Sequence, residues 1–526
     1  MTTRRAPHDS PPPPGRAGRD APESDTAGNE GPLARRTATS VAWMTLQTWL
    51  SRLGGFVTVA ILARLLTPAD FGLVAIASTV LPLVYLLADM GLTTYLVQAD
   101  RLDARTTATA FWFSAAAGLV LSAALVLLAP AIAALFGTAA AAPVIAWTAP
   151  AVLIVSLSAT PVALLRRGMR FRALSMQTAV AAIIGQILAL VLAFGGAGVW
   201  ALVAQLLAMQ LVCLVLAWAS AHWRPSFAIS AADIRRMFGF GSKVVTVDLL
   251  AIGRLWIENA VITRMLGVAA LGAYGVAQRL VQTARDLTGS AITPVTTVAF
   301  AKVRDEPERL LGGYRRAVGL AYGVVAPGLA VLFVGAPLVV PLLLGPQWQA
   351  SIEPVRALAL AGLFALGASL DHGLLYGMGR PGAWLGYAAV VEVATLAATL
   401  LLVPRGIAAI AWGFAAVAAA ALCGRWFLTG RVLRTGWWRI ATLWLPQILA
   451  FALMSGVGFA VLLSTVQLPP LVALALVALA VTGAHAAGLR LLMPPTSREL
   501  WGFVVDRARR GRRSSPTASG TRGGEG

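Results

Sequence analysis

The chain has 526 residues, of which 58% are hydrophobic and only 12% charged, and its formal net charge is +20. This composition excludes an ordinary soluble globular protein and, with runs of about 20 apolar residues, indicates a polytopic all-α membrane protein. The basic excess is concentrated between the apolar runs and in the tails, so it indicates membrane orientation and contact with anionic lipids, with no nucleic acid as a partner.

Both ends of the chain differ from its middle. Residues 1–38 are rich in proline, glycine and alanine, and we predict a disordered cytoplasmic N-terminal tail. Residues 496–526 are predicted to form a basic cytoplasmic tail that lies against anionic lipid.

Between the tails we predict fourteen transmembrane helices. The apolar runs lie near 42–63, 72–98, 108–128, 143–165, 174–194, 199–220, 242–263, 271–298, 317–343, 355–376, 383–403, 407–427, 441–463 and 470–492. With the N-terminus inside, the inner loops carry 20 Lys and Arg residues and the outer loops carry 4. This asymmetry follows the positive-inside rule and predicts that both termini are cytoplasmic.

The fourteen spans divide into two six-helix bundles and two additional C-terminal helices. We expect the first bundle at 39–222, the second at 242–428 and the two additional helices at 429–495. Residues 223–241 are predicted to be a cytoplasmic linker with a short interfacial helix that starts at Ser230 and Asp233.

An internal repeat relates the two bundles. The segment 62–77 (LARLLTPADFGLVAIA) echoes 262–277 (ITRMLGVAALGAYGVA), with Arg64 matching Arg264 and Gly72 matching Gly272. Six spans separate the copies, so they point the same way across the membrane. This pattern predicts a parallel repeat with a pseudo-two-fold axis along the membrane normal, as in many secondary transporters.

Motifs of soluble chemistry are missing or out of context. Residues 377–382 match G-x-G-x-x-G as text, but no βαβ unit surrounds them. The chain has no P-loop, HExxH or CxxC motif, and its two cysteines lie inside apolar runs. We therefore expect no catalytic residues, no metal site, no cofactor and no enzyme activity.

Charged residues inside the apolar runs are the candidate functional residues, because each costs about 2.5–3.5 kcal/mol at a helix centre. Four arginines, Arg52, Arg254, Arg279 and Arg285, are predicted to bind an anionic head group, since guanidinium forks match phosphate oxygens. Arg52 and Arg254 lie at similar depths in repeat-related helices.

A second set of residues offers ion pairing or coupling to Na⁺, H⁺ or the membrane potential. It comprises Asp89, Asp248, Glu258, Asp286, Asp371 and His372. Arg254 and Glu258 are one helical turn apart and can pair. The alternative, that all these charges are structural ion pairs fixing helix packing, stays open at this point.

Several segments resemble the polysaccharide flippases of the multidrug/oligosaccharidyl-lipid/polysaccharide exporter superfamily. The resemblance is carried by 62–77, by 163–174 (ALLRRGMRFRAL), by 88–98 (ADMGLTTYLVQ) and by 377–381 (GMGRP). It implies export of a polyprenyl-pyrophosphate-linked oligosaccharide across the bacterial plasma membrane for surface polysaccharide or lipopolysaccharide synthesis. It also implies glycosyltransferases and a polymerase of the same pathway as partners. Related lipid II flippases hold the pyrophosphate with cavity arginines, and we carry this role over to Arg52 and Arg254 by position.

Two other functions compete with this interpretation. A multidrug/cation antiporter requires an acid-dominated cavity, whereas arginine is in excess here. A membrane glycosyltransferase or polymerase usually needs a sizeable outer loop and well-placed acids, and neither is visible in the sequence.

Overall fold

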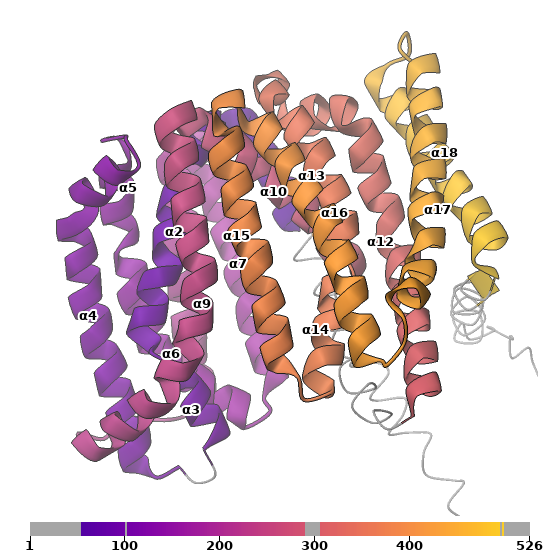
Figure 1. The fold of residues 1–526 in the computed structure, drawn as a ribbon. Coiled ribbons are helices and arrows are strands. Elements are labelled where there is room, and N and C mark those ends of the chain that lie inside the picture. Colours follow the sequence, from indigo (N-terminus) through magenta and orange to yellow (C-terminus); the bar gives the residue numbers. More distant parts are fainter. Residues whose placement is uncertain (1–53, 100–101, 290–305, 495–496, 499–526) are drawn as a thin grey trace, which may run out of the picture. The chain divides into compact units, whose positions relative to one another are not determined.

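The computed structural model describes residues 54–99, 102–289, 306–494 and 497–498. Within this part of the chain every regular element is a helix (Figure 1). The first is Gly54–Leu65, and the others are α2 (Pro68–Asp89), α3 (Leu92–Gln98), α4 (Ala104–Leu135), α5 (Ala141–Thr148), α6 (Pro150–Arg167), α7 (Phe171–Phe194), α8 (Val199–Ala221), α9 (Ala231–Leu266), α10 (Val268–Gly289), α12 (Pro307–Leu344), η1 (Pro346–Ser351), α13 (Ile352–Ala365), α14 (Ala368–Gly377), α15 (Pro381–Leu402), η2 (Val403–Arg405), α16 (Ile407–Val432), α17 (Trp437–Ser464) and α18 (Pro470–Leu492).

The expected all-α membrane protein is confirmed, while the count of fourteen spans stays a prediction. Eleven described helices are long and apolar enough to cross a bilayer. The charge-bearing helices α9 and α10 are not among these eleven. Helices α17 and α18 pack against each other and against α12, as two helices added to the second half would do (Figure 1).

Helix breaks divide three of the predicted spans. The run 72–98 separates into α2 and α3, because Met90 and Gly91 are both left-handed, with φ of 42° and 76°. The run 143–165 becomes α5 and α6, and the run 355–376 becomes α13 and α14. Apolar length alone could not reveal these breaks.

The start of α2 shows why the LTPAD sequence begins a helix. The Thr67 hydroxyl accepts from the Asp70 N–H at 3.2 Å, and the Thr67 N–H donates to the Asp70 carboxylate at 2.9 Å. With Pro68 in the first turn this is a capping box. A similar cap begins α4, where hydrogen bonds from the Thr106 side chain and backbone hold the pKa of Asp103 below its usual range.

The two copies of the internal repeat meet where α2 and α10 cross. A Cβ on Gly72 would lie 2.0 Å from the carbonyl oxygen of Val268, and one on Gly272 would lie 1.9 Å from that of Pro68. Only glycine allows this backbone approach. The matched glycines therefore form the crossing of the two halves.

The matched arginines bind backbone carbonyls of the opposite half. Arg64 donates to the carbonyls of Leu342 and Leu343 at the end of α12, the second bond measuring 3.3 Å. Arg264 donates to the carbonyl of Ala134 near the end of α4, at 3.4 Å. Each arginine thus provides positive charge at the carbonyl end of a helix, where the helix dipole is negative.

Residues 231–241, where we expected a short interfacial helix in the linker, form the first part of the continuous helix α9. Ser230 caps it by accepting from the Asp233 N–H at 3.3 Å. Met237 is buried against Leu92, Leu96 and other side chains of α3, α4 and α6. The apolar face of this segment therefore packs on the first half of the protein.

Candidate functional site

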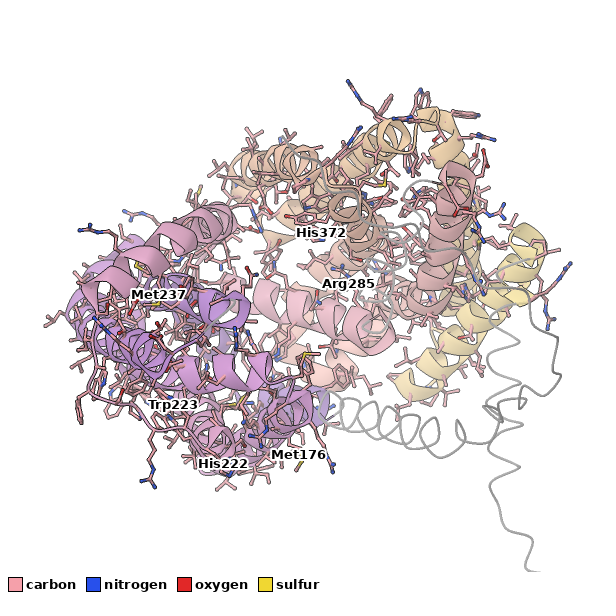
Figure 2. All side chains as sticks on the ribbon, turned by 90° about the horizontal axis from the view of Figure 1, so that it is seen from below. Met176, His222, Trp223, Met237, Arg285 and His372 are labelled. Atoms are coloured by element: carbon pink, nitrogen blue, oxygen red, sulfur yellow. The ribbon has the colours of Figure 1, made fainter. Side chains whose placement is uncertain are left out.

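A cavity of about 640 Å³ lies among α10, α13 and α16 and brings two predicted arginines together. Arg279 and Arg285 both line it, with Gln278, Gln282 and Thr283 of the same helix. Figure 2 shows Arg285 on α10 from below. A Cβ at Gly362 of α13 would lie 3.4 Å from Arg285 Cδ, so the glycine leaves room for the arginine stem.

The lining of this cavity is basic. Among the described residues, no aspartate or glutamate lines it. Arg279 is exposed and forms no ion pair with any described acid. Two guanidinium groups with neutral amide and hydroxyl neighbours suit an anion with several oxygens.

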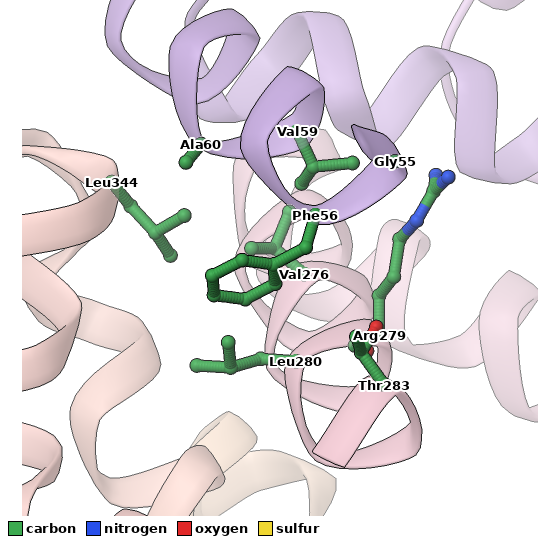
Figure 3. A pocket seen from close by; sticks show the side chains of 9 residues that line it. All are labelled: Gly55, Phe56, Val59, Ala60, Val276, Arg279, Leu280, Thr283 and Leu344. Carbon is green, nitrogen blue, oxygen red and sulfur yellow. The ribbon is translucent and has the colours of Figure 1, made fainter. Parts of the chain in front are cut away.

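Arg279 also borders a second, apolar slot of about 180 Å³. Phe56, Val59 and Ala60 of helix Gly54–Leu65 line it opposite Val276 and Leu280 of α10, and Leu344 of α12 closes one side. Figure 3 shows the Arg279 side chain extended along the edge of the slot beside Gly55. One arginine therefore links a polar cavity and an apolar slot.

Arg254 belongs to an ion cluster that joins three helices. Its guanidinium pairs with Glu258 of the same helix and with Glu392 of α15. The Tyr274 hydroxyl of α10 donates to Glu258 at 3.4 Å. The predicted Arg254–Glu258 pair is thus present, with two carboxylates for one arginine among the described side chains.

Asp371 is enclosed by a structural network. Its carboxylate lies 3.1 Å from Arg425 Nε and accepts from the hydroxyls of Tyr314 at 2.7 Å and Thr429 at 3.0 Å. Arg425 also donates to the Phe364 carbonyl and lies 5.6 Å from the Trp444 ring centroid. Asp371 is only 1% exposed and pairs with Arg425, so these contacts favour the structural alternative for this residue.

The remaining predicted residues lie elsewhere. His372 is exposed and packs beside Tyr376, with ring centroids 4.2 Å apart. Asp89 is at the end of α2, next to the helix break. Arg52 lies outside the described residues, as do the side chains of Asp248 and Asp286.

The sequence identified Glu392 as a charge within an apolar run but not its partner, and it did not indicate that Arg425 is buried. Glu392 was visible as an acid in an apolar run, but its pairing with Arg254 depends on how α15 packs on α9. Arg425 was counted with the inner loops, but it is buried inside α16 and only 3% exposed. Its position, close to the end of the run 407–427, gave no signal of burial.

Comparison with known proteins identifies the family. Residues 61–353 match the model of a family described as polysaccharide biosynthesis protein. The succinoglycan biosynthesis transport protein ExoT of Rhizobium meliloti (strain 1021) is 27% identical over 69% of this chain and 74% of its own length. The lipopolysaccharide biosynthesis protein WzxC of Escherichia coli (strain K12) is 23% identical, over 63% and 68%.

A solved structure shares the fold. The lipid II flippase MurJ in its inward closed conformation superposes with a TM-score of 0.71, covering 86% of this chain and 100% of that one, at 11% identity. Because the family model covers more than half of its residues, the chain belongs to the polysaccharide biosynthesis protein family.

Proposed function

We propose that the protein is a flippase that moves a polyprenyl-pyrophosphate-linked oligosaccharide across the bacterial plasma membrane for surface polysaccharide synthesis. The observation that carries this proposal is the basic cavity on α10, which Arg279 and Arg285 both line and which has no described acid in its lining. The transport and biosynthesis names of the relatives support it.

In this proposal the cavity binds the pyrophosphate. Arg279 and Arg285 donate to its oxygens, and the neighbouring Gln278, Gln282 and Thr283 supply neutral hydrogen bonds. Charge-assisted hydrogen bonds of this kind are roughly twice as strong as neutral ones. An acid-free basic lining suits an anionic lipid and disfavours the cationic drugs of an antiporter.

The apolar slot beside Arg279 offers a place for the first isoprene units. Its side chains are Phe56, Val59, Ala60, Val276 and Leu280. If the charged head group lies in the basic cavity and the tail runs through this slot, the head contacts polar side chains and the tail contacts apolar ones. Arg279 then stands where the head group joins the tail.

Transport proceeds by alternating access. The α2–α10 crossing and the Arg64 and Arg264 contacts hold the two halves together at the repeat junctions, which the charge asymmetry assigns to the outer side. The cytoplasmic side then admits the substrate, and the junctions part for its release. Both termini are cytoplasmic in this arrangement, and the pathway's glycosyltransferases and polymerase act before and after the protein.

Arg254 was predicted to bind the head group but does not line the basic cavity, and its cluster is the proposed coupling element, together with Asp248 and Asp286. Arg52 keeps its predicted role in binding the pyrophosphate. Two carboxylates share one guanidinium, so a proton or Na⁺ can balance the second carboxylate. Contacts from α9 to α15 and α10 make the cluster sensitive to helix movement.

Reconstituted flipping tests the function. Purified protein in proteoliposomes is supplied with fluorescent undecaprenyl-pyrophosphoryl-N-acetylglucosamine, and outer-leaflet label is quenched over time. We expect protein-dependent flipping that Arg279→Gln with Arg285→Gln lowers at least tenfold, as the loss of about 1.4 kcal/mol or more implies. Arg490→Gln, at an exposed position in the last turn of α18, is the matched control. Undiminished flipping by the double variant contradicts the proposal.

A further inference from the structure

A second cavity, in the first half of the protein, is unusually rich in hydroxyl groups. It has a volume of about 320 Å³ and lies among α2, α3, α4 and α6. Its polar lining consists of Tyr85, Asp89, Thr93, Thr94, Ser114, Ser156, Ser158 and Arg166. In helices made mostly of Ala, Leu and Val, this concentration of hydrogen-bonding groups needs an explanation.

The helix break after α2 places Asp89 in this cavity. Met90 has a φ of 42°, an uncommon conformation for a non-glycine residue, and Gly91 follows with a φ of 76°. Asp89 Oδ1 accepts from the N–H of Thr93 at 3.2 Å and from the Thr93 hydroxyl. Both bonds use the same oxygen, so Oδ2 is available to a hydrogen-bond donor in the cavity.

Two neighbouring arginines at the end of α6 differ in role. Arg167 donates to the carbonyls of Leu96 and Ala99, which fixes the end of α3. Arg166 lines the cavity and is exposed, and its guanidinium has no hydrogen bond or ion pair with another described residue. The cavity thus offers a guanidinium donor and a carboxylate acceptor on different helices.

The lining chemistry narrows the class of ligand. A phosphate would face the Asp89 carboxylate. A metal ion would lack ligands, since no group of three His, Cys, Asp or Glu side chains occurs among the described residues. A lipid tail would leave the Arg166 guanidinium and the Asp89 Oδ2 atom without partners. A neutral polyhydroxyl ligand can pair with both, because each sugar hydroxyl both donates and accepts.

We propose that this cavity is a glycan subsite, in which Asp89 and Arg166 bind hydroxyls of a sugar in the lipid-linked oligosaccharide. The inference rests on the proposed flippase function and adds a specificity element to it. A site built to hydrogen-bond a hydroxyl discriminates strongly against a ligand that lacks it. The basic cavity on α10 then recognises the carrier, and the Asp89–Arg166 cavity recognises the sugar.

Binding to the purified full-length protein in nanodiscs tests the subsite. The probes are undecaprenyl pyrophosphate alone and the same lipid carrying glucose, galactose, N-acetylglucosamine or N-acetylgalactosamine, with Kd measured by native mass spectrometry. We expect at least one sugar to tighten binding about tenfold over the bare lipid. Asp89→Asn, which can keep the cap to Thr93, and Arg166→Gln should each remove most of this gain and leave the Kd of the bare lipid unchanged.

Two serine variants, one inside the cavity and one outside it, extend the test. Ser158→Ala removes a cavity hydroxyl that donates to the Val155 carbonyl at 2.8 Å, and Ser464→Ala removes a similar bond, to Ala460, in α17. Only the first should weaken binding of the sugar-bearing lipid.

Two patterns of failure are distinguishable. If no sugar improves binding, or if the Asp89 and Arg166 variants weaken both kinds of lipid equally, the subsite is wrong while the flippase proposal stands. If wild-type protein binds no pyrophosphate lipid, or Arg279→Gln with Arg285→Gln leaves bare-lipid binding intact, the proposed function itself fails.

Discussion

Two groups of intramembrane arginine show opposite environments. Arg425 is surrounded by the Asp371 carboxylate, the Phe364 carbonyl and the Trp444 ring, so its positive charge is neutralised within the protein. Arg279 and Arg285 line a cavity without a described acid. Arginines that look alike in the sequence therefore differ in whether a described carboxylate lies beside them.

The largest expected effect comes from breaking the buried Asp371–Arg425 ion pair. Asp371→Asn leaves the Arg425 charge buried without a counter-ion, which costs about 3–5 kcal/mol of stability. Thermal unfolding followed by size-exclusion chromatography in detergent should show a large fall in Tm and reduced protein abundance. A variant with wild-type Tm would show that this ion pair does not hold α14 and α16 together.

Replacing an arginine of the basic cavity by a neutral residue should have a large effect on transport and little effect on stability. Arg279→Gln removes a charge that forms no ion pair with a described acid, so unfolding of this variant should stay close to wild type. Export of surface polysaccharide in a complemented deletion strain should fall about tenfold or more, as the loss of a charged hydrogen bond predicts. Equal losses of Tm and export would place Arg279 in the structural class.

The Arg254 cluster lies between these two cases, because Arg254 pairs with one buried and one partly exposed carboxylate. Glu258 is 3% exposed at its side chain and Glu392 is 30% exposed. Glu258→Gln should therefore destabilise the protein more than Glu392→Gln, whose effect on Tm should be small because exposed pairs contribute only about 0–1 kcal/mol. A pH profile of flipping that flattens in Glu392→Gln would link this carboxylate to coupling, and the reverse order of Tm losses would contradict the assigned burial.

Arginines that bind helix ends should give the smallest effects. Arg64→Gln and Arg264→Gln each remove contacts with terminal carbonyls, for which about 0.3–1 kcal/mol is typical at an exposed helix end. Hydrogen exchange should become faster at the ends of α12 and α4 respectively. Arg405→Gln, exposed in η2, is the control, and unchanged exchange in both variants would show that these contacts do not link the halves.

The sequence predicted much of the fold because its signals were local. Apolar runs and the LTPAD cap predicted helices, and the 200-residue echo predicted matched halves, whose glycines do meet at Gly72 and Gly272. The length of the run 72–98 allowed for a kink or short loop, but the position of the break at Met90 was not predicted, because a left-handed methionine has no local signature. The fourteen-span count and the predicted role of Arg52 remain predictions.

The site was predicted only in part, because pairing is a property of packing. Arg279 and Arg285 were identified as charges in one apolar run, and they do line one cavity. Asp371 looked the same in the sequence, but Arg425 pairs with it and Tyr314 donates a hydrogen bond to it from other helices. Which charges meet across helices depends on how helices that are distant in the sequence pack together, and hydrophobic periodicity carries no information on that packing.

The central claim is that Arg279 and Arg285 bind the pyrophosphate, and head-group selectivity tests it most directly. Native mass spectrometry can compare binding of undecaprenyl pyrophosphate with that of undecaprenol, which has the same tail and no charge. We expect wild-type protein to bind undecaprenyl pyrophosphate at least tenfold more tightly than undecaprenol, and we expect the Arg279→Gln, Arg285→Gln double variant to lose this preference. An undiminished preference in a folded double variant would contradict the claim.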